Sequence, residues 1–174
     1  MTMGCSCLIL LNIPLAKFIY AKDFFEAWKC SSVLLVSVMF NTLSVFQGSI
    51  FSAVKKTKTI AITTIISAMV NTVLNILFIP IIGVIGAAIS TAFAYFVMWF
   101  VRYIYLKKYI SMKINLLKDI CIYMIIVVQI IFEHLKEHYY LGQIICFLLI
   151  VYINRQYIKS IIDVFRKKFG YEKR

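Results

Sequence analysis

The chain has 174 residues, 63% of them hydrophobic and only 15% charged, and its mean hydropathy is +0.91. Soluble globular domains do not reach these values. The formal net charge of +12 is large enough for a nucleic-acid-binding protein, but the basic residues stand between long apolar runs and not on one polar module. The composition therefore predicts an all-α polytopic membrane protein without a nucleic-acid partner, and it explains the basic residues as orientation signals.

The first two apolar stretches predict membrane spans at residues 1–18 and 30–54. The first span lacks the basic start and the cleavage site of a secretory signal peptide. A short amphiphilic connection at residues 21–29 separates the two spans. One sector of the second span, about 60° wide, carries small and polar side chains, which is typical of a helix that packs around a shared interior. These side chains are Ser37, Asn41, Ser44, Gly48 and Ser52, with Gln47 on the flank.

Two further spans, at residues 59–82 and 83–106, predict a hairpin. The uncharged run that begins at Thr59 is long enough, at about 1.5 Å per residue, to cross a bilayer core of about 30 Å. We expect the proline in this region to end the first helix and the glycines beyond it to permit a tight reversal. The motif that makes the break consists of Pro80, Gly83, Gly86, Ala87 and Ala88.

Both helices of the predicted hairpin have a polar or small face. On the first helix, a sector of roughly 100° holds Thr64, Ser67, Ala68, Asn71 and Asn75. On the second, a narrower ridge holds Gly83, Ala87, Ser90 and Ala94. Small residues let helix backbones approach closely in lipid. The two asparagines have two interpretations, which both stay open: they form hydrogen bonds between helices, each contributing about 0.6–2 kcal/mol, or they line a polar cavity.

The rest of the chain is more polar. Residues 102–118 predict a basic and aromatic connection at the membrane interface. Two shorter spans are predicted at residues 116–135 and 139–155, with their end charges snorkelling to the interface, and an interfacial hairpin is the alternative. Residues 156–174 predict a basic amphipathic tail on the membrane surface, in contact with lipid. The chain is thus expected to form one six-span bundle over residues 1–155.

The distribution of basic residues predicts the orientation. All but four of the 19 basic residues fall on one side of the predicted spans, and the exceptions are Lys17, Lys22, Lys29 and Lys136. Cytoplasmic loops carry an excess of Lys and Arg. We therefore expect a multi-pass protein of the cell inner (plasma) membrane with both termini in the cytoplasm.

One motif matches a metal site. His134, Glu137 and His138 form H-x-x-E-H, the pattern of inverted zinc proteases. It falls in a short turn, and the chain contains no further histidine, so we expect an ordinary polar loop. The five cysteines form no C-x-x-C pair, and no phosphate-binding or dinucleotide-binding glycine pattern is present. We expect no catalytic residue, no metal, no cofactor and no enzymatic activity.

Two segments resemble a known family. They are FQGSIFSAVKKTK at residues 46–58 and NTVLNILFIPIIGVIGAAIST at residues 71–91. Together they resemble the C-terminal half of the polysaccharide flippases, the O-antigen (Wzx-type) translocases of the MATE-like multidrug/oligosaccharidyl-lipid/polysaccharide exporter superfamily. The resemblance is strong over residues 20–108. The chain departs from the family pattern at Val54 and Lys55, where the family has a small residue and a glycine.

The resemblance implies a function. Such flippases carry undecaprenyl-diphosphate-linked O-antigen or capsule repeat units, for lipopolysaccharide or capsule biosynthesis, across the inner membrane by alternating access between two helical bundles. Because family members have 12–14 spans, it also implies an N-terminal half as partner, from the same gene or a separate chain. That half is expected to supply the cations for the diphosphate. The present chain is expected to supply a neutral polar wall for sugar hydroxyls, made of Asn41, Ser44, Gln47, Asn71 and Asn75.

Two other function classes stay open at this point. The first is a non-transporting protein, either a truncated remnant or an accessory membrane protein of polysaccharide biosynthesis. The second is a membrane-embedded enzyme of envelope glycan synthesis, which depends on the H-x-x-E-H match alone.

Overall fold

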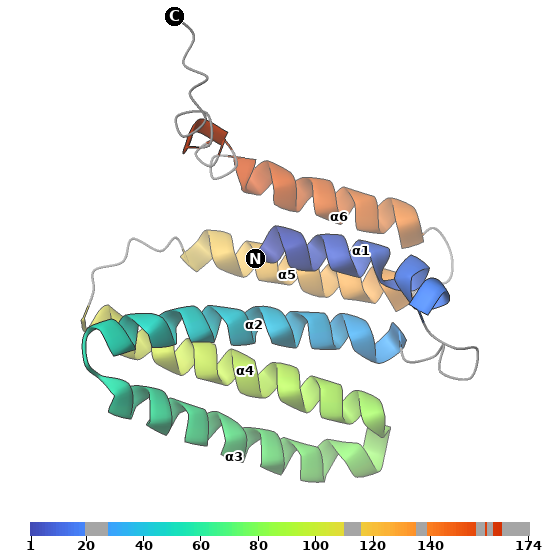
Figure 1. Ribbon diagram of the computed structural model, residues 1–174. Helices are drawn as coiled ribbons and strands as arrows, with labels where there is room; N and C mark the ends of the chain where they lie inside the picture. Colours follow the sequence, from blue (N-terminus) through green and yellow to red (C-terminus); the bar gives the residue numbers. More distant parts are fainter. Residues whose placement is uncertain (20–27, 110–115, 135–138, 156–158, 160–161, 165–174) are drawn as a thin grey trace, which may run out of the picture. The chain divides into compact units, whose positions relative to one another are not determined.

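The computed structural model of the protein describes residues 1–19, 28–109, 116–134, 139–155, 159 and 162–164. Within the described residues, helices account for all the regular secondary structure (Figure 1). They are α1 (Thr2–Ile19), α2 (Trp28–Ala53), α3 (Thr57–Ile82), α4 (Val84–Lys107), α5 (Leu116–His134) and α6 (Tyr139–Ile153). The all-α fold class predicted from the sequence is confirmed.

Four of these helices, α1 to α4, are long and apolar enough to cross a membrane. The helix α6 is apolar but shorter, and α5 carries Lys118, Asp119 and Glu133 near its ends. The count of six spans therefore stays a prediction. The predicted connection 21–29 lies largely outside the described residues, as do residues 135–138 of the H-x-x-E-H motif and most of the tail.

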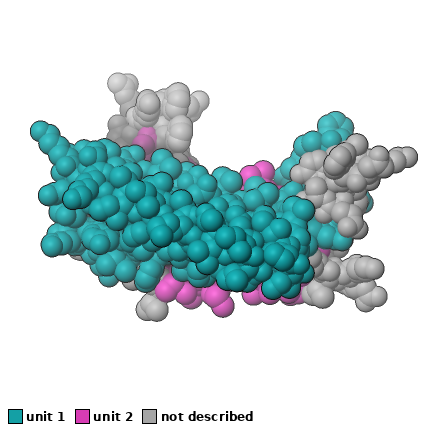
Figure 2. Space-filling model, turned by 90° about the horizontal axis from the view of Figure 1, so that it is seen from below, with its two compact units in different colours: residues 1, 11–114 teal, residues 2–10, 115–174 magenta. Residues whose placement is uncertain are grey.

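The chain divides into two compact units (Figure 2). One comprises residue 1 and residues 11–114, and the other comprises residues 2–10 and 115–174. In the first unit, both α2 and α3 pack on α4 and have few contacts with each other. The ring of Phe40 on α2 packs against those of Phe96 and Trp99 on α4, with centroid separations of 5.3 and 5.8 Å. Within this unit, α4 is thus the helix on which both α2 and α3 pack.

The α3–α4 hairpin turns at Gly83, one of the glycines expected to permit the reversal. Pro80 lies inside the last turn of α3, which continues to Ile82, so the expectation that this proline ends the helix is wrong. Pro80 lacks one backbone donor, yet α3 completes its last turn beyond it. Gly83 has φ 60° and ψ −137°, a backbone conformation that favours glycine, and its N–H donates to the carbonyl of Ile79 at 2.9 Å.

Gly86 holds the two helices of the hairpin close together. A Cβ atom at this position would lie 2.7 Å from the backbone oxygen of Phe78, so no larger residue fits without moving the backbone. Beyond it, Ala88, Ser90 and Ala94 are buried, whereas Ala87 is half-buried and Gly83 is exposed. The predicted small ridge is therefore buried only in its second part.

The second unit contains a polar contact between distant parts of the chain. The hydroxyl of Ser6 donates to Oε1 of Gln129 at 2.7 Å, and Nε2 of Gln129 donates back to the carbonyl of Ser6 at 3.0 Å. The helices α5 and α6 pack on each other. Gly142 permits this contact, because a Cβ there would lie 2.9 Å from the ring of Phe132.

Candidate functional site

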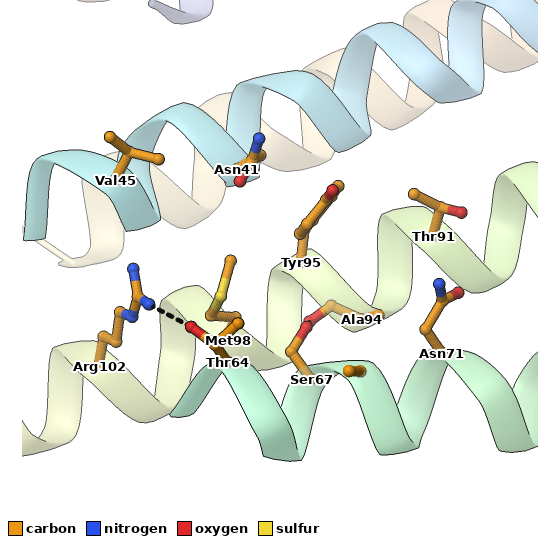
Figure 3. A pocket seen from close by; sticks show the side chains of 11 residues that line it. Asn41, Val45, Thr64, Ser67, Asn71, Thr91, Ala94, Tyr95, Met98 and Arg102 are labelled. Carbon is orange, nitrogen blue, oxygen red and sulfur yellow. Dashed lines mark hydrogen bonds between the residues drawn. The ribbon is translucent and has the colours of Figure 1, made fainter. Parts of the chain in front are cut away.

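A cavity of about 380 Å³ lies in the first unit, with walls from α2, α3 and α4 (Figure 3). The helices α2 and α3 both pack on α4 but have few contacts with each other. A space therefore remains between α2 and α3, and α4 forms its third wall. The lining mixes small, polar and apolar side chains with one charged group. The lining residues are Asn41, Val45, Thr64, Ser67, Ala68, Asn71, Thr91, Ala94, Tyr95, Met98 and Arg102.

Arg102 closes one end of the cavity. Its side chain is only 4% exposed, and its guanidinium connects α4 to both neighbouring helices. Nε donates to Oγ1 of Thr63 at 2.9 Å and Nη2 to Oγ1 of Thr64 at 2.9 Å. On α2, Nη1 donates to the carbonyl of Ser44 at 2.6 Å. A longer bond of 3.4 Å joins Nη2 to the carbonyl of Ile60.

Gly48 makes room for this guanidinium on α2. A Cβ at residue 48 would lie 3.3 Å from Nη1 of Arg102, which is tighter than an ordinary contact. Among the cavity-lining residues there is no acidic side chain to balance the cation. Neutral oxygen atoms of α2 and α3 therefore compensate for the burial of this charge. Through these hydrogen bonds the guanidinium connects α4 to both other helices.

Two further hydroxyls of the cavity wall are already satisfied within the protein. The hydroxyl of Ser67 donates to the carbonyl of Ala94 at 2.7 Å, across the hairpin. The hydroxyl of Thr91 donates to the carbonyl of Ala87 one turn back, at 2.8 Å. Such bonds let hydroxyl-bearing residues lie in an apolar environment without an unpaired donor.

The structure separates the five residues of the predicted polar wall. Asn41 and Asn71 line the cavity. Ser44 is fully buried behind it, where its hydroxyl donates to the carbonyl of Phe40. Gln47 is buried outside the lining, and its Oε1 has no hydrogen-bond partner among the described residues. Asn75 also lies outside the lining, and its Nδ2 is 3.4 Å from Oδ1 of Asn71.

Arg102 and Tyr95 are among the cavity residues that were not predicted as site residues from the sequence. Arg102 was assigned to the basic connection 102–118, which overlaps the end of the predicted span 83–106, because it is the first charge after a long apolar run; in the structure α4 continues to Lys107. One signal was available: Ala94, Met98 and Arg102 recur every four residues and so share one face of a helix. Tyr95 lies next to this face and carried no signal, because aromatic residues are frequent throughout the chain.

The chain is 30% identical over 100 residues to a protein of Methanocaldococcus jannaschii that is described as an uncharacterized membrane protein. This chain is a helical membrane protein. The aligned segment is 58% of the chain but only 19% of that relative, so the relative is roughly five times as long as the shared segment. No family model matches the chain, and no solved structure matches it.

Proposed function

We propose that the protein is part of a membrane flippase that translocates lipid-linked oligosaccharide, an undecaprenyl-diphosphate-linked O-antigen or capsule repeat unit, across the inner membrane. The observation that carries this proposal is the polar cavity between α2, α3 and α4. Polar and charged residues inside membrane helices are energetically costly and usually serve a pathway or a binding site. The volume of about 380 Å³ lies in the usual range for small-ligand sites, about 300–1,000 Å³.

The chemistry of the cavity agrees with a glycan as the translocated group. Its wall offers amides and hydroxyls from Asn41, Asn71 and Tyr95, which match the donor and acceptor pairs of sugar hydroxyls. The apolar outer faces of α2 to α4 suit the lipid phase in which an undecaprenyl chain lies. In this proposal a second helical bundle completes the cavity from the other side, and alternate opening of the two bundles moves the glycan.

A reconstituted assay tests the proposal. The chain is placed in liposomes alone, or together with the N-terminal half of a polysaccharide flippase, with fluorescent undecaprenyl-diphosphate-N-acetylglucosamine as the probe. A reductant that does not cross the membrane destroys only the fluorophores on the outer leaflet. Further loss of fluorescence therefore reports translocation of the probe from the inner leaflet to the outer leaflet. We expect translocation to be faster with both halves than in protein-free liposomes. Equal rates in all three preparations would instead identify a non-transporting membrane protein.

Matched variants connect the transport activity to the cavity. Asn41→Leu and Asn71→Leu remove the two amides that line it, and we expect the double variant to lose translocation while still inserting into the membrane. The control is Thr42→Leu with Thr72→Leu, which changes the neighbouring residues, whose hydroxyls bond within their own helices. If both double variants transport equally, the cavity is not the pathway.

A further inference from the structure

We propose that the end of the cavity formed by Asn41, Asn71 and Tyr95 is a binding site for one neutral sugar ring, with Tyr95 as its stacking surface. This site deepens the proposed function and rests on it, because it assigns the part of the lipid-linked glycan that this chain recognises. The polar groups at the two ends of the cavity differ in whether they already have hydrogen-bond partners within the protein.

The charged end of the cavity has little binding capacity left. A guanidinium has five N–H groups, and Arg102 uses four of them on Thr63, Thr64 and two backbone carbonyls. The hydroxyl of Thr64 accepts one of these bonds and donates its own proton to the carbonyl of Ile60 at 2.8 Å. A ligand at this end would have to break bonds that hold the three helices together, so Arg102 forms a wall of the cavity.

The opposite end has unused hydrogen-bonding groups. Within the part of the chain that the structure describes, neither the amide of Asn41 nor the hydroxyl of Tyr95 forms a hydrogen bond, and the amide nitrogen of Asn71 donates none. These groups come from three different helices, and Figure 3 shows Tyr95 and Asn71 well away from Arg102. Tyr95 and Arg102 are seven residues apart on α4, a rise of about 10 Å. The free groups therefore form a neutral subsite, separate from the charge.

A sugar ring fits the chemistry of this subsite. An amide both donates and accepts hydrogen bonds, as a sugar hydroxyl does. A tyrosine offers an apolar face and a polar tip, and one face of many sugar rings is formed by C–H groups that pack on such a surface. An anionic group would need a free cation, and the one cation among the cavity-lining residues is occupied. The subsite therefore selects the neutral glycan over the diphosphate that links it to the lipid.

Binding measurements on the whole chain in lipid nanodiscs test this assignment. The probes are undecaprenyl diphosphate without a sugar and the same lipid carrying N-acetylglucosamine or galactose. We expect at least one glycosylated probe to bind about tenfold more tightly than the sugar-free lipid, which corresponds to about 1.4 kcal/mol. Tyr95→Leu and Asn71→Leu should remove this preference and leave the affinity for the sugar-free lipid unchanged.

Two controls separate the site from general effects on folding. Phe93→Leu removes an exposed aromatic ring from the same helix, and Thr72→Leu changes the residue next to Asn71. Both should keep the preference for the glycosylated lipid. Tyr95→Phe keeps the ring and should retain part of the preference. The assignment is overturned if the three probes bind the wild-type chain equally, or if Tyr95→Leu and Phe93→Leu lower the affinity for every probe alike.

The result is independent of transport. A sugar preference that Tyr95→Leu abolishes would establish the subsite even if reconstituted liposomes show no translocation, and then the flippase proposal alone would fail. Translocation without any such preference would retain the flippase proposal and reject the subsite.

Discussion

Arg102 illustrates how a charged side chain is accommodated among apolar helices. Its guanidinium contacts no acidic group in the cavity wall, and its hydrogen bonds go instead to threonine hydroxyls and to backbone carbonyls of α2 and α3. The threonines also bond to carbonyls of their own helix, so they stay satisfied whether or not the arginine is present. The planar fork of the guanidinium is essential here because a lysine ammonium cannot reach both helices with the same geometry.

The first residue-scale prediction follows from this fork. Arg102→Lys keeps the charge but loses contact with at least one helix, and Arg102→Leu loses all four bonds. We expect the free energy of unfolding to fall by about 1–3 kcal/mol, because hydrogen bonds from a charged group contribute roughly this much. Thermal unfolding in detergent measures the effect. The control is Lys108→Leu, an exposed residue just beyond α4, and an equal midpoint for Arg102→Leu and Lys108→Leu would contradict the role of Arg102.

The sequence predicted part of this site, for a definite physical reason. Asn41 and Asn71 stand out because a polar amide in an uncharged membrane helix is unusual, and helical spacing places them on small, polar faces. The same spacing included Ser44, Gln47 and Asn75, because a sector of 60–100° is wider than the part of a helix that faces one cavity. Which part of the sector faces the cavity depends on the rotation of each helix about its axis. The ring contacts of Phe40 fix this rotation for α2, and the hydrogen bond from Ser67 to the carbonyl of Ala94 fixes it for α3.

At the scale of the elements, the α3–α4 hairpin determines the shape of the cavity. The cavity wall includes Ser67 from α3 and Ala94 from α4, and the hydrogen bond between them fixes the register of the two helices. The close approach at Gly86 sets their separation near the turn. The sequence predicted the helix limits to within a few residues, because basic residues bound the outer ends of the two uncharged runs and glycines mark the turn between them. The reversal expected at the glycines agrees with the turn at Gly83, and only the expectation that Pro80 ends the helix was wrong.

An alanine substitution tests the hairpin. In Gly86→Ala the new Cβ would lie 2.7 Å from the backbone oxygen of Phe78, and a backbone atom cannot move aside as a side chain can. We expect a lower thermal midpoint and weaker sugar binding, because the walls of the cavity separate. Gly4→Ala is the matched control, since a Cβ there meets no atom within 4 Å. If the two variants unfold at the same temperature, the close approach at Gly86 contributes nothing to stability.

A second element-scale prediction concerns the small residues of α4. Ala94 is 2% exposed, whereas Ala87 is half-buried. Ala94→Leu adds three carbon atoms at a buried position beside the hydrogen bond from Ser67 on α3, and overpacking of this kind typically costs about 1–3 kcal/mol. Ala87→Leu should cost less, because its side chain is partly free. The yield of monodisperse protein in detergent compares them, and a larger loss for Ala87→Leu would contradict the burial of the α4 face.

At the scale of the whole molecule, the number of membrane crossings depends on α5 and α6. The 15 residues of α6 extend for roughly 22 Å, less than a bilayer core of about 30 Å. In α5, Asp119 and Glu133 are 14 residues apart and close to the two ends. Lipid can thin around a short helix at a modest cost for each ångström of mismatch, and long end side chains can extend to the interface.

Reporter fusions decide between a crossing pair and an interfacial hairpin. By the excess of basic residues, fusions after Lys58 and Lys108 should report the cytoplasm and a fusion after Ile82 the outside. If α5 and α6 both cross, a fusion after Lys136 reports the outside and one after Arg155 the cytoplasm. Lys136 is the only Lys or Arg between Lys118 and Arg155. Because cytoplasmic loops carry an excess of Lys and Arg, we expect the loop at Lys136 to lie outside and both helices to cross. A cytoplasmic signal after Lys136 would reduce the protein to four spans, and a cytoplasmic signal after Ile82 would remove the hairpin on which the cavity depends.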